Sequence, residues 1–280
     1  MNYNNAIHIS TRVSYWLRHN PQEAKLIMDE KGWVLITDIL LALDNLGFQI
    51  SNKELIDLNN SFEKKRWEFN PTSIRAKYGH SVSVIHKSFE IEPPETLYHG
   101  TSIENITKII ASGLLPMNRN NVHLSDDFES AEKIGKRHGY PIVIELDTEE
   151  LIDNEIKFFA VDEHVWLSEA LPSNLISLTP WHAVLDHNRK NVVLDELKKE
   201  VSRSHSLFNK LKNLELIFYN QTCDDRLFID NVTKECFVIH LTWKGSEEIE
   251  GFPGYNSYKS LDEWVKTGFF EDYQYFYGLK

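Results

Sequence analysis

Isolated basic side chains in four short stretches are the groups of this chain best suited to chemistry. The stretches span residues 16–21, 74–81, 97–102 and 117–125, and the basic residues that matter most are Arg18, His19, Arg75 and Arg119. Arginine keeps its charge at any physiological pH and offers a forked set of donors that fits phosphate. Histidine can take up and release a proton near neutral pH. If these side chains converge in the fold, they form an anion site suited to phosphate chemistry on a nucleotide.

Each of these side chains also has a purely structural explanation. Arg18 and His19 end a predicted helix, where positive charge stabilises the C-terminal end of the helix dipole. Arg75 in a hairpin can be a solvated cross-strand partner, and Arg119 can be an ordinary loop residue. Histidines beside glycines or within apolar strands are often satisfied core residues, and this applies to His80, His99 and His123. No single stretch decides between the two interpretations; the set of four, in this order, indicates a shared site.

The first segment, residues 1–90, has the pattern of a small helical domain with a hairpin. Apolar residues recur at helical spacing over residues 9–19, and an Asn-Pro pair ends this helix. A short strand and two helices follow, the last of which begins with a Ser51–Glu54 capping box. A hairpin over residues 66–79 completes the segment. This order of elements predicts a winged-helix-like lobe.

The second segment, residues 91–180, alternates strands with short helices. It follows a proline-containing linker at 90–95 and starts with a strand at 97–101 that turns into a helix. Thr101 and Glu104 have the spacing of a second capping box, so that Thr101 and the helix N-terminus would present donors to a ligand. Further apolar strands are expected downstream. The pattern predicts an α+β domain rich in β-structure.

The third segment, residues 181–280, holds 17 of the 33 aromatic residues of the chain. A charged helix at 194–211 precedes three predicted strands, a glycine-proline loop and a final helix near 261–267. This pattern predicts a small α+β accessory domain. The aromatic loop at 251–258 could recognise a partner, although such aromatics more often fill a small core. A protein partner bound through residues 181–280 is therefore one interpretation of this domain.

Composition narrows the class of protein. The net charge of −12 divides into +1 for residues 1–90, −10 for 91–180 and −3 for 181–280, so nucleic acid would have to be held by a few local cations. No apolar run is long enough for a membrane span and no export signal is visible, which predicts a cytoplasmic protein. The sequence contains no dinucleotide-type or P-loop glycine motif and no zinc-ligand spacing, so catalysis without a metal is expected.

Eight short motifs in register resemble the RNA 2′-phosphotransferase (KptA-type) family over about residues 8–180. They are W-L-R-H-N-P at 16–21, G-W-V at 32–34, K-R-W at 65–67, I-R-A-x-x-G-H-S at 74–81, L-Y-H-G-T at 97–101, G-L-x-x-M-x-R-x-x-V-H-L-S at 113–125, R-H-G at 137–139 and V-W-L at 165–167. One such motif would be a weak signal, whereas eight in order are strong. Residues 181–280 lie outside the resemblance.

The resemblance implies a two-lobed enzyme with an extension. A winged-helix-like lobe would meet the RNA, and the next lobe would have the NAD-binding fold of ADP-ribosyltransferases. The family reaction removes an internal 2′-phosphate from RNA, with tRNA splicing as one biological setting. The 2′-phosphate first displaces nicotinamide from NAD. The 2″-hydroxyl of the attached ADP-ribose then attacks the phosphate, releasing RNA with a free 2′-hydroxyl and ADP-ribose 1″,2″-cyclic phosphate.

The resemblance also implies roles for individual residues of this sequence. The expected catalytic residues are Arg18, His19, Arg75 and Arg119. The residues expected to hold NAD are Tyr98, His99, Gly100, Thr101, His123 and Val165. Contacts to the RNA and its phosphate are expected from Arg18, His19, Arg66, Arg75, Lys77 and His80. No metal is expected.

The sequence departs from the family pattern at a few positions, which affect the expected fit of substrate and NAD. They are Lys77 and Tyr78 in place of an amide pair, Asn121 in place of a histidine, and Glu163 and His164 before Val165. Two other functions stay open at this point. One is an ADP-ribosyltransferase that leaves its label on a nucleic-acid terminal phosphate, a protein or a small molecule. The other is an RNA-binding or regulatory module without catalysis.

Overall fold

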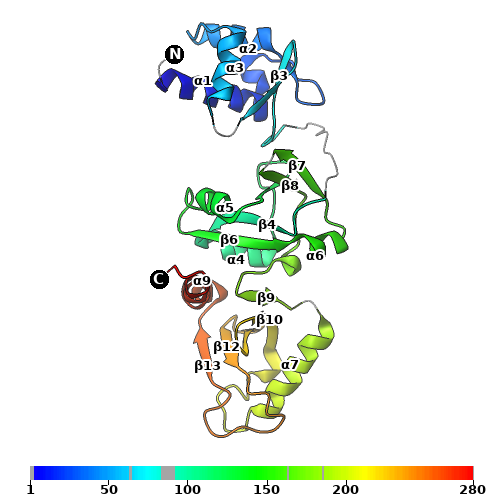
Figure 1. Cartoon of the computed structure of the whole chain (residues 1–280). Coiled ribbons are helices and arrows are strands. Elements are labelled where there is room, and N and C mark those ends of the chain that lie inside the picture. The colour runs from blue at the N-terminus through cyan, green and yellow to red at the C-terminus, as the bar shows by residue number, and fades with distance from the viewer. Residues whose placement is uncertain (1–2, 63–64, 83–91, 163, 185, 280) are drawn as a thin grey trace. The chain divides into compact units, whose positions relative to one another are not determined.

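The structure, a computed structural model, describes residues 3–62, 65–82, 92–162, 164–184 and 186–279 (Figure 1). It divides the chain into two compact units, each built from several stretches of sequence. The first unit comprises Met1–Glu92, Pro116–His123 and Lys157–Glu169, and the second Pro93–Leu115, Leu124–Ile156 and Ala170–Lys280. The predicted α+β class is confirmed, since helices and several sheets are present. The predicted boundaries near residues 90 and 180 stay a prediction.

Three helices and a short sheet form the body of the first unit. They are α1 (Tyr3–Arg18), α2 (Ile36–Asn45) and α3 (Asn52–Asn60), with β1 (Val34–Leu35), β2 (Trp67–Phe69) and β3 (Ser73–Ala76) in the order β1-β3-β2. Apolar side chains spaced along one face of α1 pack with those of α2 and α3 in a single core, which includes Val13, Leu17 and Trp67. The predicted helices and hairpin are confirmed, and so is the Ser51–Glu54 capping box.

Burial alternates along β3, and this alternation determines what its side chains face. Ile74 and Ala76 are buried in the core against α1, whereas Ser73 and Arg75 lie on the other face. A second hairpin of the first unit consists of β7 (Phe158–Asp162) and β8 (Val165–Ser168), which pair antiparallel. A 3₁₀ turn, η1 (Pro21–Ala24), follows α1 and ends it where the Asn-Pro pair predicts.

The second unit begins with strands that carry several predicted site residues. β4 (Thr96–Ser102) pairs antiparallel along its whole length with β6 (Pro141–Asp147), and its Tyr98 pairs with Ser125 at the end of β5 (Val122–Ser125). α4 (Ile103–Ser112) and α5 (Phe128–Gly135) connect these strands, and α6 (Thr148–Asp153) follows β6. The expected Thr101–Glu104 capping box is wrong, because α4 begins one residue later, with Ser102 as a cap that makes no side-chain hydrogen bond. Gly113 ends α4 with a positive φ.

The last hundred residues fold as a five-stranded antiparallel sheet with helices on its two faces. The strand order is β13-β12-β11-β10-β9, for β9 (Trp181–Ala183), β10 (Leu214–Asn220), β11 (Asp225–Asp230), β12 (Cys236–His240) and β13 (Tyr255–Tyr258). α7 (His187–Glu200) packs on one face through Val193 and Leu197. It starts and ends earlier than the predicted helix at 194–211, because Asp186 caps it and Glu200 is its last residue.

Within the second unit, the C-terminal helices also bind to the strands that precede the extension. α8 (Leu261–Trp264) is followed by a π-helical turn, η4 (Val265–Phe269), and by α9 (Phe270–Phe276). The hydroxyl of Tyr273 accepts a hydrogen bond from the backbone of Val143 in β6, and that of Tyr277 donates to Glu145. The extension is therefore packed into the second unit rather than attached by a free linker. No described helix is both long and apolar enough to cross a bilayer.

Candidate active site

Arg18, the last residue of α1, is the centre of a cationic cluster in the first unit. Its guanidinium lies over the ring of Tyr78, with 5.1 Å between the central carbon and the ring centroid. Nε and Nη2 are buried and make no hydrogen bond to any residue that the structure describes. Burial lowers the pKa of Arg18 from its usual value, and the nearby charges of Arg66 and Arg119 lower it further. A buried cation with unsatisfied donors is costly unless it is paired, so this group is a candidate binding site for an anion.

Arg66 and Arg119 bring two more guanidinium groups near Arg18. Arg66 is held just before β2, where its Nη1 donates to Ser10 of α1 at 3.0 Å and its guanidinium lies over Phe62. Asn59 fixes the backbone there, since its side-chain oxygen accepts from the N–H of Arg66. Among the described residues, neither arginine forms an ion pair with a carboxylate. Like charges gathered without a counter-charge are stabilised when an anion binds between them.

His19 follows Arg18 and lies at the edge of the same cluster. Its Nδ1 is 3.0 Å from the hydroxyl of Ser81, and the backbone N–H of Ser81 donates to the carbonyl of Arg18. Desolvation lowers the pKa of His19 below its ordinary value of 6.5, and the charges of Arg18 and Arg119 add to the effect. The imidazole is therefore neutral at neutral pH and can accept a proton.

The lowered pKa of His19 gives a measurable expectation. Replacing Arg119 by glutamine should raise the pKa of His19 towards 6.5, because one of the charges that oppose its protonation is removed. The histidine titration can be followed by NMR, with His19→Gln used to assign the signal. Since the folded-state pKa is depressed, the contribution of His19 to folding stability is present above pH 6.5 and is lost as the pH falls.

Arg12→Gln is the matched control for that titration, since Arg12 is an exposed arginine of α1 paired with Glu23. It should leave the pKa of His19 nearly unchanged. A pKa of His19 at or above 6.5 in the unsubstituted protein, or one that Arg119→Gln does not move, would contradict the proximity of these groups.

Arg75 is not brought to this cluster by the described contacts. Its guanidinium pairs with Glu68 of β2 at 2.6 Å, donates to the backbone carbonyl of Lys31 and lies over the ring of Trp33. It occupies the face of β3 opposite the core, as the alternation along that strand requires. Three of the four expected catalytic residues therefore lie together, and Arg66, expected only as an RNA contact, joins them.

The segment before β5 reaches the same part of the first unit. The backbone N–H of Asn120 donates to the carbonyl of His80, and its side chain donates to that of Val82. His123 is edge-on to Tyr78, with ring centroids 6.2 Å apart, and its Nδ1 contacts the carbonyl of Asn121 at 3.2 Å. His80 is buried, and Lys77 is half-buried next to Tyr78. Tyr78 and Asn121, two of the departures from the family pattern, thus contribute to the surroundings of Arg18 and His123.

The other residues expected to hold NAD belong mostly to β4 in the second unit. Tyr98, His99 and Gly100 are half-buried there, and the ring of Tyr98 is edge-on to Phe128 at 6.0 Å. Thr101 is buried, and its hydroxyl accepts a hydrogen bond from the side chain of Asn105. Gly100 faces the backbone of Ala131 in α5. The glycine is therefore required by helix–strand packing, and the NAD contact expected of it is not needed to explain it.

Val165 begins β8 in the first unit and is half-buried, with the buried Trp166 next to it. His164, the departure just before it, is exposed. Glu163 lies outside the described residues, and so do residues 90–91 of the expected linker.

The first unit thus contains what a phosphate-transfer site requires. Arg18, Arg66 and Arg119 supply positive charge with donors, and His19 supplies a neutral proton acceptor fixed by Ser81. Groups of this kind, held in place by secondary structure, stabilise charge that builds on a phosphoryl group during reaction.

The first 170 residues of the chain are similar to known proteins. Residues 4–170 match the model of the family described as RNA 2'-phosphotransferase, Tpt1 / KptA family. A probable RNA 2'-phosphotransferase from Bacillus thuringiensis subsp. konkukian is 40% identical over 174 residues, which are 61% of this chain and 94% of that protein. Proteins with the same description from Fusobacterium nucleatum subsp. nucleatum and Streptomyces coelicolor are each 35% identical; the matches cover 61% and 65% of this chain, and 98% and 100% of theirs. Residues 181–280 lie beyond the family match.

Proposed function

The chain belongs to the RNA 2′-phosphotransferase, Tpt1/KptA family, and we propose that it removes an internal 2′-phosphate from RNA with NAD as co-substrate. The products are RNA with a free 2′-hydroxyl, nicotinamide and ADP-ribose 1″,2″-cyclic phosphate. The observation that carries the proposal is the buried guanidinium of Arg18, with two unsatisfied donor atoms and two further arginines nearby. Such a cluster fits a doubly charged phosphate better than any neutral acceptor.

The arginines hold and orient the 2′-phosphate. Arg18 supplies the buried donors Nε and Nη2, and Arg66 and Arg119 add charge at the more exposed side. The phosphate needs no general base for its attack, because it is already anionic. When it is itself attacked in the second step, negative charge builds on its oxygens, and the same guanidinium groups stabilise that charge.

His19 serves the second step as a proton acceptor. Its lowered pKa keeps the imidazole neutral near pH 7, so that it can take the proton of the attacking ribose hydroxyl. Ser81 holds the ring through Nδ1, which leaves the other ring nitrogen for the substrate. Tyr15, one turn earlier in α1, packs against the ring at 5.9 Å and limits its movement.

NAD supplies an anomeric carbon with nicotinamide as leaving group. Tyr98 and His99 on β4 fit its binding, because both are partly exposed and can offer flat rings to nicotinamide and ribose. The buried Thr101 on the same strand is proposed to contribute to that site, and the NAD contacts expected of His123 and Val165 stay predictions. The segment 91–180 would then be an ADP-ribosyltransferase-like lobe, and the segment 1–90 a winged-helix-like lobe that meets the RNA through Arg18, Arg66, Lys77 and His80.

The proposal predicts a specific set of products. Purified protein, NAD and a short RNA with one internal 2′-phosphate should release nicotinamide and ADP-ribose 1″,2″-cyclic phosphate in equal amounts, measured by chromatography and mass spectrometry. The same RNA with a 2′-hydroxyl at that position is the control, and nicotinamide release should stop with it because the anion is the nucleophile.

Two outcomes would contradict this function. An ADP-ribose group that stays on RNA, protein or a small molecule would indicate an ADP-ribosyltransferase that retains its label. No consumption of NAD by folded protein, with tRNA and other 2′-phosphorylated RNAs tried in turn, would indicate an RNA-binding module without catalysis.

A further inference from the structure

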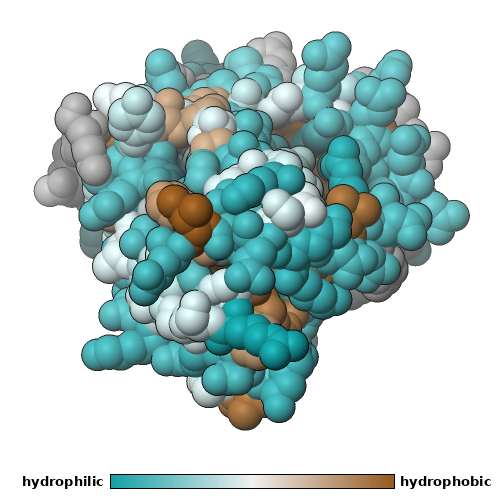
Figure 2. Space-filling view, turned by 90° about the horizontal axis from the view of Figure 1, so that it is seen from below, coloured by the Kyte–Doolittle hydropathy of each residue, from teal (hydrophilic) through white to brown (hydrophobic). Residues whose placement is uncertain are grey.

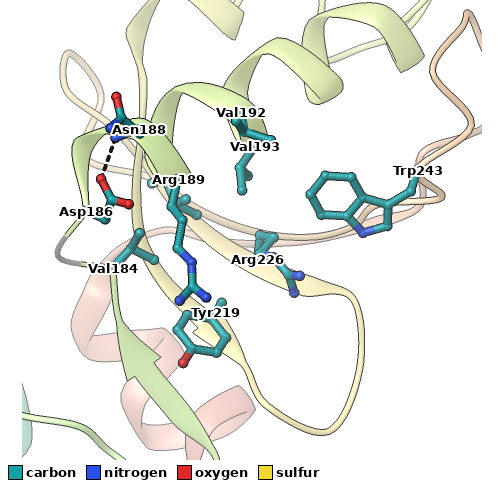
Figure 3. Close-up of a pocket in the computed structure, with 10 residues that line it drawn as sticks. Val184, Asp186, Asn188, Arg189, Val192, Val193, Tyr219, Arg226 and Trp243 are labelled. Atoms are coloured by element: carbon teal, nitrogen blue, oxygen red, sulfur yellow. Dashed lines mark hydrogen bonds between the residues drawn. The ribbon is translucent and has the colours of Figure 1, made fainter.

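A hollow of about 450 Å³ lies in the C-terminal extension, outside the residues that match the family (Figure 3). It opens beside the N-terminal half of α7, on the face of the sheet that this helix covers. Its apolar floor includes Val184, Val193 and Leu216. Around this floor stand two aromatic rings, Tyr219 and Trp243, and two arginines, Arg189 and Arg226.

A β-bulge places Tyr219 and Arg226 in this hollow. The register of β10 against β11 shifts between Leu216 and Phe218, so the next pair, Tyr219 and Arg226, comes onto the face that carries Leu216. If β10 alternated regularly through residue 217, without the bulge, Tyr219 would point to the opposite face, towards α8. The bulge therefore ends the apolar core and begins a polar, aromatic site on the same face.

Trp243 has an unusual backbone conformation. Its φ is 55°, in the left-handed region that bulky residues rarely adopt, and the residue is 41% exposed. The indole N–H donates to Asp224 at 2.8 Å, which fixes the ring at the rim of the hollow. A strained, exposed tryptophan anchored in this way offers a ring face to a ligand.

The two arginines differ in how they are engaged. Arg226 lies between the rings of Tyr219 and Trp243, at 5.9 and 5.7 Å from their centroids. Its Nη1 donates to the backbone carbonyls of Cys223 and Asp225, and its Nη2 lies 3.6 Å from the carboxylate of Asp224. Burial lowers its pKa from the usual value. Arg189, on the exposed side of α7, points toward Tyr219 and has no hydrogen-bond or ion-pair partner among the residues that the structure describes (Figure 3). The carboxylate of Asp186, which also lines the hollow, accepts from the backbone N–H of Asn188 as the cap of α7. Arg189 is thus available to an anion.

The surface around the extension does not suggest a broad apolar interface. The face in Figure 2 is mainly hydrophilic, and its hydrophobic residues are scattered rather than joined in one patch. A small concave site with ring faces and cations is instead suited to a flat, negatively charged molecule. Aromatic rings that stack a base, beside arginines that hold the phosphate, are the arrangement by which proteins bind single nucleotides of a strand.

We propose that this hollow is a second nucleotide-binding site, in which a base stacks on Trp243 and Tyr219 while its phosphate binds Arg189 and Arg226. The occupant is either a nucleotide of an RNA strand or a free nucleotide, since both present a base and a phosphate. The inference is independent of the proposed reaction, because it concerns residues that take no part in it.

The test is calorimetric titration of the full chain with AMP, adenosine, inorganic phosphate and an unphosphorylated hexa-adenylate. AMP should bind more tightly than adenosine or phosphate, since the site uses both parts of the nucleotide. Tighter, salt-dependent binding of hexa-adenylate than of AMP would identify RNA as the occupant, and equal binding would identify the free nucleotide. If inorganic phosphate binds as well as AMP, no base is recognised and the proposal fails.

Two variants separate this site from the candidate active site. Trp243→Gly removes the ring but suits a positive φ, so it should keep the melting temperature near that of the unsubstituted protein while AMP binding weakens by about tenfold or more. Arg189→Gln should weaken AMP binding to a similar extent, and Arg203→Gln, at an exposed arginine outside the hollow, should not. AMP binding that survives both Trp243→Gly and Arg189→Gln belongs elsewhere on the chain and overturns the proposal.

Discussion

Arg66→Ala is expected to slow release of ADP-ribose 1″,2″-cyclic phosphate by roughly 10²–10³-fold, the loss typical of removing one group that stabilises transition-state charge. Arg75→Ala is expected to keep most of the rate of cyclic phosphate release. The physical reason is the difference in their partners. Arg66 is held toward Arg18 by Ser10 and Phe62 and has no carboxylate among its described contacts. Arg75 is already neutralised by Glu68 and covered by Trp33.

The two variants form a matched pair, since both remove one arginine from the β2–β3 region of the same unit. Circular dichroism and thermal unfolding should show that both proteins are folded. Arg75→Ala should lose only a small amount of stability, because the Arg75–Glu68 ion pair that it removes is partly exposed. Nicotinamide release and cyclic phosphate release should be measured separately. Removing a cationic group that mainly serves the second step lowers cyclic phosphate release more than nicotinamide release. An inactive Arg75→Ala protein together with an active Arg66→Ala protein would restore the catalytic role expected for Arg75 from sequence.

The sequence contains the information that places one of these two arginines, Arg75. In Ser73–Ala76, the apolar residues Ile74 and Ala76 must face the core, so Arg75 between them faces away from α1, where Arg18 ends. Arg66 precedes Trp67, whose indole is tied to Ser14 of α1. The motif order predicts that several arginines share a site. Alternation explains why Arg75 points away, whereas Arg66 joins the cluster through its hydrogen bond to Ser10 of α1, which neither the motifs nor the alternation express.

Other features depend on packing that no local pattern reveals. The helices and strands of residues 3–82 follow from the spacing of apolar residues and from the residues that begin and end each element. The capping box at Ser51 is confirmed. The hollow of the extension depends on one bulged residue in β10, which leaves no mark in an apolar strand sequence. The same is true of the C-terminal helix, because the hydrogen bond from Val143 to Tyr273 joins residues 130 positions apart. Long-range pairing of this kind decides which parts of the chain form one unit.

Gly100→Ala is expected to destabilise the second unit by about 3 kcal/mol or more, at the upper end of the usual cost of overpacking. A Cβ at this position would lie far inside van der Waals contact of the carbonyl oxygen of Ala131, and backbone atoms cannot rotate away as a side chain would. The approach of α5 to β4 is close at a second point, since a Cβ at Gly135 would meet the carbonyl oxygen of Thr101. Both glycines let the helix pack directly on the strand, so neither position can accept a methyl group without moving α5.

Thermal unfolding provides the measurement, and Gly254→Ala is the matched control because a Cβ there meets no atom within 4 Å. The Gly100 variant should melt roughly 6–12 °C lower, whereas the Gly254 variant should melt within a degree or two of the unsubstituted protein. Because Tyr98 and His99 lie on the same strand, displacement of β4 should also weaken NAD binding. A Gly100→Ala protein of normal stability that has lost only NAD binding would show that the glycine serves the ligand, as the sequence motif suggests, and not the packing of α5 on β4.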